Sequence, residues 1–193
     1  MRPIINILGA HSFNEVFFDD VRVPKEALVG EKNRGWYYLT TALNYERGCI
    51  VRLPATLNAL LLELVGYVKE TAGTCGVLAD DLEVQQKLAD LATEIEVCRL
   101  LCYRVADLAD KGISPAYETS EAFVFGNELL RRFAKTAGEI IGPYGQLAKK
   151  SQLSPLRGVI QGLYLDTVGT GIGAGSSEIQ RNIIATIGLG LPR

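Results

Sequence analysis

Apolar residues that recur every three or four positions dominate the sequence from Gly35 onward, and this spacing constrains the fold more than any other feature. Such spacing places apolar side chains on one face of an α-helix. The first run ends near Gly73, and its apolar positions are Leu39, Leu43, Ile50, Leu53, Leu57, Leu60 and Leu64. Pro54 lies inside this run and removes one backbone donor, so we expect a kinked helix rather than a broken one.

The second helical run has recognisable start and stop residues. It begins at Asp80 or Asp81, where Asp80 and Glu83 have the spacing of a capping box. Its apolar positions are Val84, Leu88, Leu91, Ile95, Cys98, Cys102, Val105 and Leu108. The pair Lys111-Gly112 is a stop signal.

Three more helices are predicted after Gly112. The third begins with Ser114 as its N-cap and Pro115 in the first turn, and it ends at Gly142. The fourth covers about residues 154–168, and a short last helix covers about residues 176–187. Long amphipathic helices joined by short loops favour an up-and-down bundle.

The N-terminal segment has a β pattern instead. Phe13–Val23 alternates β-forming and polar residues, and Ile4–Leu8 is a candidate for a preceding strand. Two strands are not stable alone, so we expect them to pair with something outside this segment. The predicted fold class is therefore mainly α, with an up-and-down four-helix bundle preceded by a short β segment.

Composition excludes several classes of function. The chain has 193 residues, 48% of them hydrophobic, and a net charge of −2 with both signs mixed, which argues against a nucleic-acid surface. We find no apolar run near the roughly 20 residues that cross a bilayer, and no signal peptide. We therefore expect a cytoplasmic protein without a membrane span.

The cysteines and the single histidine give no metal-ligand spacing. Cys98 and Cys102 share a helical face, and with Cys49 and Cys75 they form no CxxC pair. Reduced thiols packed as small hydrophobic residues are the favoured interpretation. His11 is the only histidine and receives little weight as a catalytic base. We expect no metal site.

Position 46 falls on the apolar stripe of the first helix, yet it holds Glu46. A carboxylate on a buried stripe must be paired, be protonated or face a ligand cavity. An ion pair with Arg47, Arg52 or an arginine of another helix is one interpretation. A general base in an apolar pocket is the other, and the sequence pattern does not separate the two.

A glycine-rich loop precedes the last helix. Gly169, Gly171, Gly173 and Gly175 alternate before Ser176, which is a plausible N-cap. Exposed N–H groups at a helix start favour anions, and glycine permits close backbone approach. The spacing is not the dinucleotide-binding fingerprint, so a flexible turn between helices is the favoured alternative.

Four stretches together carry a resemblance that covers nearly the whole chain. They are FNEVFFDDVRVPKEALVGEKNRGW, NYERG, EIIGPYGQL and SSEIQRNIIATIGLGLPR. In this order they resemble an acyl-CoA dehydrogenase, a flavoprotein family with a helical domain, a middle β-domain and a C-terminal four-helix bundle. The resemblance implies that residues 1–24 are the end of the middle β-domain and residues 25–193 the C-terminal bundle.

The resemblance also implies a reaction and its residues. The family carries out FAD-dependent α,β-dehydrogenation of an acyl-CoA thioester, in which a glutamate takes the α-proton and the flavin takes a hydride. Many members carry this glutamate where this chain has Ala174. A branch similar to isovaleryl-CoA dehydrogenases carries it in a Glu-Arg pair on the first bundle helix. That pair matches Glu46 as general base and Arg47 as the candidate substrate-binding residue.

Cofactor residues are implied in the same way. Ser176 and Glu178 match family positions that contact FAD, and Gly142 and Gly145 match a glycine turn near the FAD of a neighbouring subunit. Two departures stand out in this chain. Glu139 replaces a frequent glutamine, and residues 69–76 lack the arginine and phenylalanine of a family FAD motif.

Partners follow from the resemblance too. It implies an acyl-CoA substrate, an electron-transferring flavoprotein as acceptor, and a homo- or hetero-oligomer, either dimer or tetramer. Arg181 could order the last helix or face the CoA, but an ion pair within the bundle is favoured. Two alternatives remain open: a non-catalytic helical subunit that binds no flavin alone, and a related flavin oxidase that uses the same base.

Overall fold

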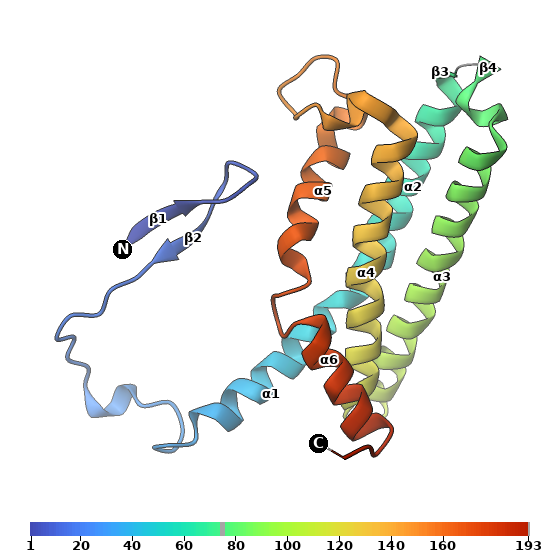
Figure 1. The fold of residues 1–193 in the computed structure, drawn as a ribbon. Helices are drawn as coiled ribbons and strands as arrows, with labels where there is room; N and C mark the ends of the chain where they lie inside the picture. The colour runs from blue at the N-terminus through green and yellow to red at the C-terminus, as the bar shows by residue number, and fades with distance from the viewer. Residues whose placement is uncertain (74–75, 193) are drawn as a thin grey trace. The chain divides into compact units, whose positions relative to one another are not determined.

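The computed structural model describes residues 1–73 and 76–192, and it divides into two compact units, Met1–Glu46 and Arg47–Arg193. Figure 1 shows the β hairpin in the first unit and the helical bundle in the second. Each unit is described separately below. Cys75, whose side chain was predicted to be a reduced core thiol, lies outside the described residues.

The first unit holds a hairpin, a 3₁₀ turn and a helix. Strands β1 (Arg2–Ile5) and β2 (His11–Glu15) pair antiparallel, the 3₁₀ turn spans Lys25–Ala27, and α1 spans Gly35–Arg47. The strand predicted over Phe13–Val23 is too long, because pairing stops at Glu15. Asp20 has a φ of 47°, a left-handed conformation that cannot continue a strand.

The second unit is the predicted bundle. Its helices are α2 (Leu53–Glu70), α3 (Leu82–Asp110), α4 (Ala116–Ile141) and α5 (Val159–Thr170). Helix α4 packs against α2, α3 and α5, and Figure 1 shows these helices side by side. The predicted fold class is thereby confirmed.

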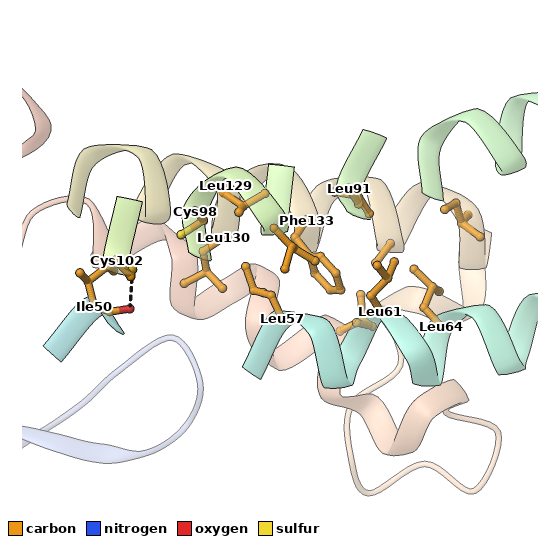
Figure 2. Packing of buried hydrophobic residues seen from close by; sticks show 14 of the residues in the cluster. Ile50, Leu57, Leu61, Leu64, Leu91, Cys98, Cys102, Leu129, Leu130 and Phe133 are labelled. Carbon is orange, nitrogen blue, oxygen red and sulfur yellow. Dashed lines mark hydrogen bonds between the residues drawn. The ribbon is translucent and has the colours of Figure 1, made fainter. Parts of the chain in front are cut away.

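The bundle core is built from the faces that the apolar spacing predicted. Phe133, Leu57, Leu64 and Leu129 have no exposed surface, and Figure 2 shows them within one cluster. The predicted stripe of α3 is buried at Val84, Leu91, Ile95, Cys98, Cys102 and Val105. Gly126 lies at a close approach of α4 to the chain before α2, because a Cβ there would be 3.0 Å from Ile50.

The helical run predicted around Pro54 is present, and its irregularity lies just before the proline. Helix α1 ends at Arg47, a 3₁₀ segment spans Gly48–Arg52, and α2 starts anew at Leu53. Pro54 therefore lies in the first turn of α2, where its missing N–H leaves no helical hydrogen bond unmade. The backbone stays right-handed helical at Arg52 and Leu53, so the run changes from 3₁₀ to α geometry at the proline without a break.

Two predicted N-caps are also misplaced by one residue. Asp81, rather than Asp80, caps α3, since its carboxylate accepts from the N–H groups of Glu83 at 2.8 Å and Val84 at 3.4 Å. At α4 the cap position is Pro115, without a side-chain cap hydrogen bond, rather than Ser114. The predicted stops are confirmed at Gly112 and Gly142, which both have a φ of 71°.

Shorter elements connect the bundle helices. Strands β3 (Ala72–Gly73) and β4 (Gly76–Val77) pair antiparallel before a 3₁₀ turn at Leu78–Asp80. Further 3₁₀ turns span Gly142–Gln146 and Pro155–Gly158. Helix α6 (Ser177–Ile183) continues as a π-helical segment over Ile184–Gly188.

One helical run has the length and apolar composition to cross a membrane, among the residues that the structure describes. It is the consecutive series Gly35–Glu70, so the expectation that no run of this kind is present is wrong. Apolar core helices of soluble proteins have the same composition. The α2 part of this run supplies Leu57, Leu61 and Leu64 to the bundle core.

Candidate functional site

The loop before α6 is held by two buried polar side chains. The Nε of Arg47 donates to the carbonyl oxygen of Ala174 at 2.9 Å. The amide nitrogen of Gln180 donates to the same carbonyl at 3.0 Å and to that of Gly175 at 3.2 Å. Arg47 is 7% exposed and Gln180 is fully buried. These four residues form what we call the loop clamp, which fixes the backbone at the end of the glycine-rich segment.

The loop clamp explains why glycine is needed at position 175. Ala174 and Gly175 have φ values of 53° and 96°, so the chain turns through the left-handed region twice. A Cβ at position 175 would lie 2.8 Å from the Gln180 amide nitrogen and 3.2 Å from an Arg47 nitrogen. The flexible turn favoured from the sequence is therefore a turn with a fixed geometry.

Glu46 does not occupy the buried stripe position predicted for it. Its side chain is exposed, whereas the adjacent Arg47 and then Ile50 are buried. The α spacing fails here because α1 ends at Arg47, and the 3₁₀ segment that follows has about three residues per turn. Within the part of the chain that the structure describes, no ion pair to Glu46 is found.

A cavity of about 640 Å³ lies beside the turn that follows α4. Gly142 and Gly145, both predicted as cofactor contacts, line it. The remaining lining residues come from the end of α4, the turn and α5: Ala134, Lys135, Gly138, Glu139, Gln146, Ile160, Gln161, Tyr164 and Leu165. At Gly145 a Cβ would lie 3.2 Å from the Gly138 carbonyl oxygen, so the turn packs closely on α4.

The other two predicted cofactor residues lie elsewhere. Ser176 precedes α6 at its N-cap position, without a side-chain cap bond, and Glu178 is exposed in the first turn. A hydrogen bond from the Ser176 side chain lowers the pKa of the Glu178 carboxyl. Neither residue lines the cavity at Gly142, so the structure does not bring the four predicted cofactor residues into one pocket.

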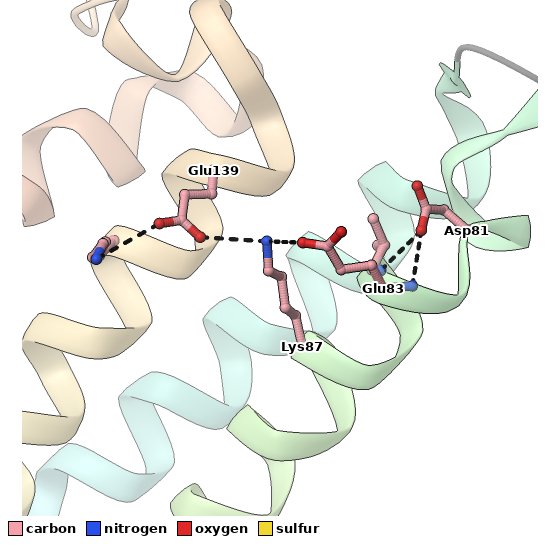
Figure 3. A network of polar contacts seen from close by, with 6 residues as sticks. Asp81, Glu83, Lys87 and Glu139 are labelled. Carbon is pink, nitrogen blue, oxygen red and sulfur yellow. Dashed lines mark hydrogen bonds and ion pairs between the residues drawn. The ribbon is translucent and has the colours of Figure 1, made fainter.

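Glu139 is the acidic member of the cavity lining, and it is held by two lysines. Its carboxylate lies 3.4 Å from the Nζ of Lys87 and 3.8 Å from the Nζ of Lys135. Lys87 also pairs with Glu83 at 2.8 Å, and Figure 3 shows this chain of contacts between α3 and α4. The hydrogen bond that Lys87 donates to the Glu83 carboxylate, and to a smaller extent the one it donates to Glu139, raises the pKa of Lys87.

The lysines of this network were not identified from the sequence. Two pairs of opposite charge are four residues apart in the sequence, Glu83 with Lys87 and Lys135 with Glu139. This spacing places both members of a pair on one helix face and could have predicted these two ion pairs. The contact from Lys87 to Glu139 joins two helices and depends on how α3 and α4 pack. Sequence spacing does not contain that information.

The structure also tests the predictions for Arg181 and for the cysteine side chains. Arg181 forms an ion pair with Glu128 of α4, as the favoured interpretation stated. Cys98 and Cys102 are buried, and the Cys102 thiol lies 3.8 Å from the Ile50 carbonyl oxygen, whereas Cys49 is exposed. Among described residues, no group of three or more His, Cys, Asp or Glu side chains is arranged to hold a metal ion.

The cavity lining combines apolar side chains with two charged residues, Lys135 and Glu139. Ile160, Leu165 and the ring of Tyr164 are its apolar lining residues, and Gly142 has no atom within 4 Å of a Cβ position. Glu139 can accept hydrogen bonds from hydroxyl or amino groups. A carboxylate at this place does not suit a diphosphate.

Comparison with known proteins identifies the family. The family model of the acyl-CoA dehydrogenase C-terminal domain matches residues 33–189. Acyl-CoA dehydrogenases FadE26 and FadE29 of Mycobacterium tuberculosis are 34% and 35% identical to this chain over 99% of its length. The solved ChsE4-ChsE5 complex of the same organism superposes on 99% of the chain with a TM-score of 0.85 and 33% identity.

The match covers the chain but not the whole of its relatives. This chain spans 48% of the length of FadE26 and of FadE29, and 49% of the matched chain of the ChsE4-ChsE5 complex. The family model covers most of the chain, and its helical bundle is the fold that the structure contains. The chain belongs to the acyl-CoA dehydrogenase family.

Proposed function

We propose that this chain is the C-terminal portion of an FAD-dependent enzyme that removes hydrogen from the α and β carbons of an acyl-CoA thioester. Family membership supports an oxidoreductase of the acyl-CoA dehydrogenase class. The finer assignment depends on which residue takes the α-proton. Two positions of this chain are relevant, Ala174 in the loop and Glu46 at the end of α1.

The general base in this proposal is Glu46. Ala174 has no group that exchanges a proton, and its backbone carbonyl is already bonded to Arg47 and Gln180. Glu46 instead carries an exposed carboxylate next in the chain to Arg47, and this observation carries the proposal. In the complete site the carboxylate would be desolvated by the acyl chain, which strengthens it as a base.

The residues that would hold FAD are Gly142 and Gly145, at the cavity, and Ser176 and Glu178, at the start of α6. The glycines allow backbone approach, and the Ser176 hydroxyl can hydrogen-bond to a ligand as well as to Glu178. When bound, the flavin supplies the hydride acceptor of the reaction. Arg47, through its bond to Ala174, would fix the loop, and the proposal also gives it a contact with the substrate.

An oligomer and an external electron acceptor complete the proposal. The solved relative is a complex of two named components, ChsE4 and ChsE5. We propose an oligomer of this kind, homo- or heteromeric, which passes electrons to an electron-transferring flavoprotein. We also propose a cytoplasmic location, which fractionation of the source cells would test.

A second candidate function is an assembly subunit that binds no flavin by itself. Glu139 favours it, because a carboxylate in the cavity opposes a diphosphate-bearing cofactor. The visible absorbance of the purified chain separates the two candidates. A flavin band supports cofactor binding by the chain, and a colourless chain that gains flavin only with a partner supports the assembly role.

The test of the catalytic assignment is Glu46→Gln in the complete flavoprotein that contains this chain. We expect flavin reduction by acyl-CoA under anaerobic conditions to slow by about 10²- to 10⁴-fold, with the bound FAD content unchanged. Glu26→Gln, another exposed glutamate of the same unit, is the matched control and should reduce at the wild-type rate. Undiminished reduction in the Glu46 variant removes Glu46 from this role.

A further inference from the structure

The side of α3 that points away from the bundle carries a row of apolar side chains. Cys98 and Cys102 are buried in the core, and Leu100 lies between them in the sequence, on the opposite side of the helix. Val97, Leu100 and Tyr103 follow one another at intervals of three residues and are 40%, 56% and 58% exposed. Figure 1 shows α3 at the edge of the bundle, where it packs against α2 and α4. A row of exposed apolar side chains marks a surface that another molecule covers.

Charged and polar side chains flank this row. Thr93 and Asp107 lie seven residues before and after Leu100, which is about two helical turns, so these three residues share the centre of the surface. Glu96 and Arg104 lie four residues before and after Leu100, and their side chains are about half exposed. We call this surface the outer face of α3, and its residues are all exposed: Thr93, Glu96, Val97, Leu100, Tyr103, Arg104 and Asp107.

The outer face of α3 has opposite charges at equal distances from Leu100. In an antiparallel pair of α3 helices that meet at Leu100, Glu96 of each helix faces Arg104 of the other. Thr93 of each helix then faces Asp107 of the other, and the threonine hydroxyl can donate to the carboxylate. A parallel pair would instead place like charges against each other, which opposes association. The charges therefore favour a second α3 that runs in the antiparallel direction.

This arrangement selects a second copy of the chain as the occupant. Two identical antiparallel helices are related by a two-fold axis, so one surface serves both molecules and the contact closes with two copies. A partner of unrelated sequence would have to supply a base opposite Glu96, an acid opposite Arg104 and an apolar group opposite Leu100. A second copy supplies all three at the required spacing.

The charged groups of the outer face are partly ordered and still able to bind. Arg99 pairs with Glu96 and donates to the Tyr103 hydroxyl at 3.3 Å, so these side chains lose less freedom on association. Arg104 lies 3.2 Å from the Tyr117 hydroxyl and 3.6 Å from the Glu118 carboxylate, and both contacts use its Nη2 atom. A guanidinium has five N–H donors, so Arg104 can also donate to a carboxylate of a second copy.

We propose that the outer face of α3 is an interface with a second copy of this chain, in which two α3 helices pack antiparallel around Leu100. This inference rests on the oligomer in the proposed function and names the surface that forms it. No residue of this face lines the cavity beside Gly142, so the contact leaves that cavity accessible.

The first test measures the mass of the full 193-residue chain by sedimentation equilibrium over a range of concentrations. We expect the wild-type chain to dimerise. Leu100→Arg should raise the dimer Kd at least about tenfold, because it places two positive charges together at the two-fold axis. Leu62→Arg is the matched control, since Leu62 is a 64% exposed leucine on α2, and its Kd should stay within about twofold of the wild-type value. Circular dichroism checks that each variant is folded.

A charge exchange tests the antiparallel direction. Glu96→Arg alone should raise the dimer Kd about three- to tenfold, because position 96 then faces Arg104 with a like charge. Adding Arg104→Glu to the same chain should return the Kd to within about twofold of the wild-type value. Positions 96 and 104 are eight residues apart on one helix and do not face each other there, so the recovery has to come from contact between two copies.

Three outcomes overturn the inference: a monomeric wild-type chain at every concentration, equal weakening by Leu100→Arg and Leu62→Arg, or no recovery in the double variant. Each differs from a failure of the proposed catalytic function. Glu46→Gln tests proton removal through flavin reduction and should leave the dimer mass unchanged, whereas the α3 variants are judged by mass alone.

Discussion

At the scale of single residues, the tightest constraint is at Gly175. Its φ of 96° is a backbone conformation that side chains rarely adopt, and the space for a Cβ is occupied by Gln180 and Arg47. We expect Gly175→Ala to lower the free energy of unfolding by about 1–3 kcal/mol. The measurement is urea denaturation followed by circular dichroism.

A neighbouring glycine supplies the control for this prediction. Gly173 has no atom within 4 Å of a Cβ position, and its φ is not in the left-handed region. Gly173→Ala should therefore leave the stability unchanged or raise it by a few tenths of a kcal/mol. Equal losses in the two variants would show that the loop clamp does not determine the conformation at Gly175.

For the residues around the loop clamp, the sequence predicted which side chains are present but not which of them are buried. Glu46, Arg47 and Ala174 were singled out from the sequence as the positions relevant to a general base. Their burial was not predictable, because it depends on the residue at which α1 ends. If the buried position is shifted by one residue, Arg47 is buried in place of Glu46. Helix ends are difficult to predict to within one residue, so this shift could not be foreseen.

At the scale of secondary-structure elements, Asp81 controls the start of the longest helix. Its carboxylate accepts hydrogen bonds from two backbone N–H groups in the first turn of α3. These N–H groups would otherwise have no partner within the helix. We expect Asp81→Ala to lower the free energy of unfolding by about 0.5–2 kcal/mol, measured by urea denaturation.

Asp80→Ala is the informative comparison, because Asp80 has the capping-box spacing but lies in the 3₁₀ turn before the cap. Its stability should stay within about 0.5 kcal/mol of the wild-type value. The reverse order of effects would place the helix start at Asp80. Sequence spacing favoured Asp80, since only Asp80 has Glu83 three residues later, but this spacing does not say which aspartate has the extended backbone that a cap needs.

At the scale of the whole molecule, the buried core lies entirely in the second unit. Among the described residues, none before Arg47 is buried, and the core begins at Ile50. We therefore expect a chain shortened to residues 47–193 to retain cooperative thermal unfolding, with its Tm within about 5 °C of the full chain. Calorimetry of both chains is the measurement, and loss of a cooperative transition would show that residues 1–46 are needed for the bundle.

The sequence by itself determined the fold class, the helix faces and the candidate residues. Apolar spacing is sufficient for this because a helix repeats every 3.6 residues wherever it lies, so Leu57, Cys98 and Phe133 are identified as core residues without knowledge of their partners. The glycine stops at Gly112 and Gly142 are local for the same reason, since a left-handed residue ends a helix whatever surrounds it.

Only the tertiary structure decided how these residues meet. The bond from Arg47 to Ala174 joins positions 127 residues apart, and the contact from Lys87 to Glu139 joins two helices. Neither contact follows from a helical or strand repeat in the sequence, because each depends on how distant parts of the chain pack together. The loop clamp and the charge of the cavity are therefore properties of the folded bundle, although every group in them could be read from the sequence.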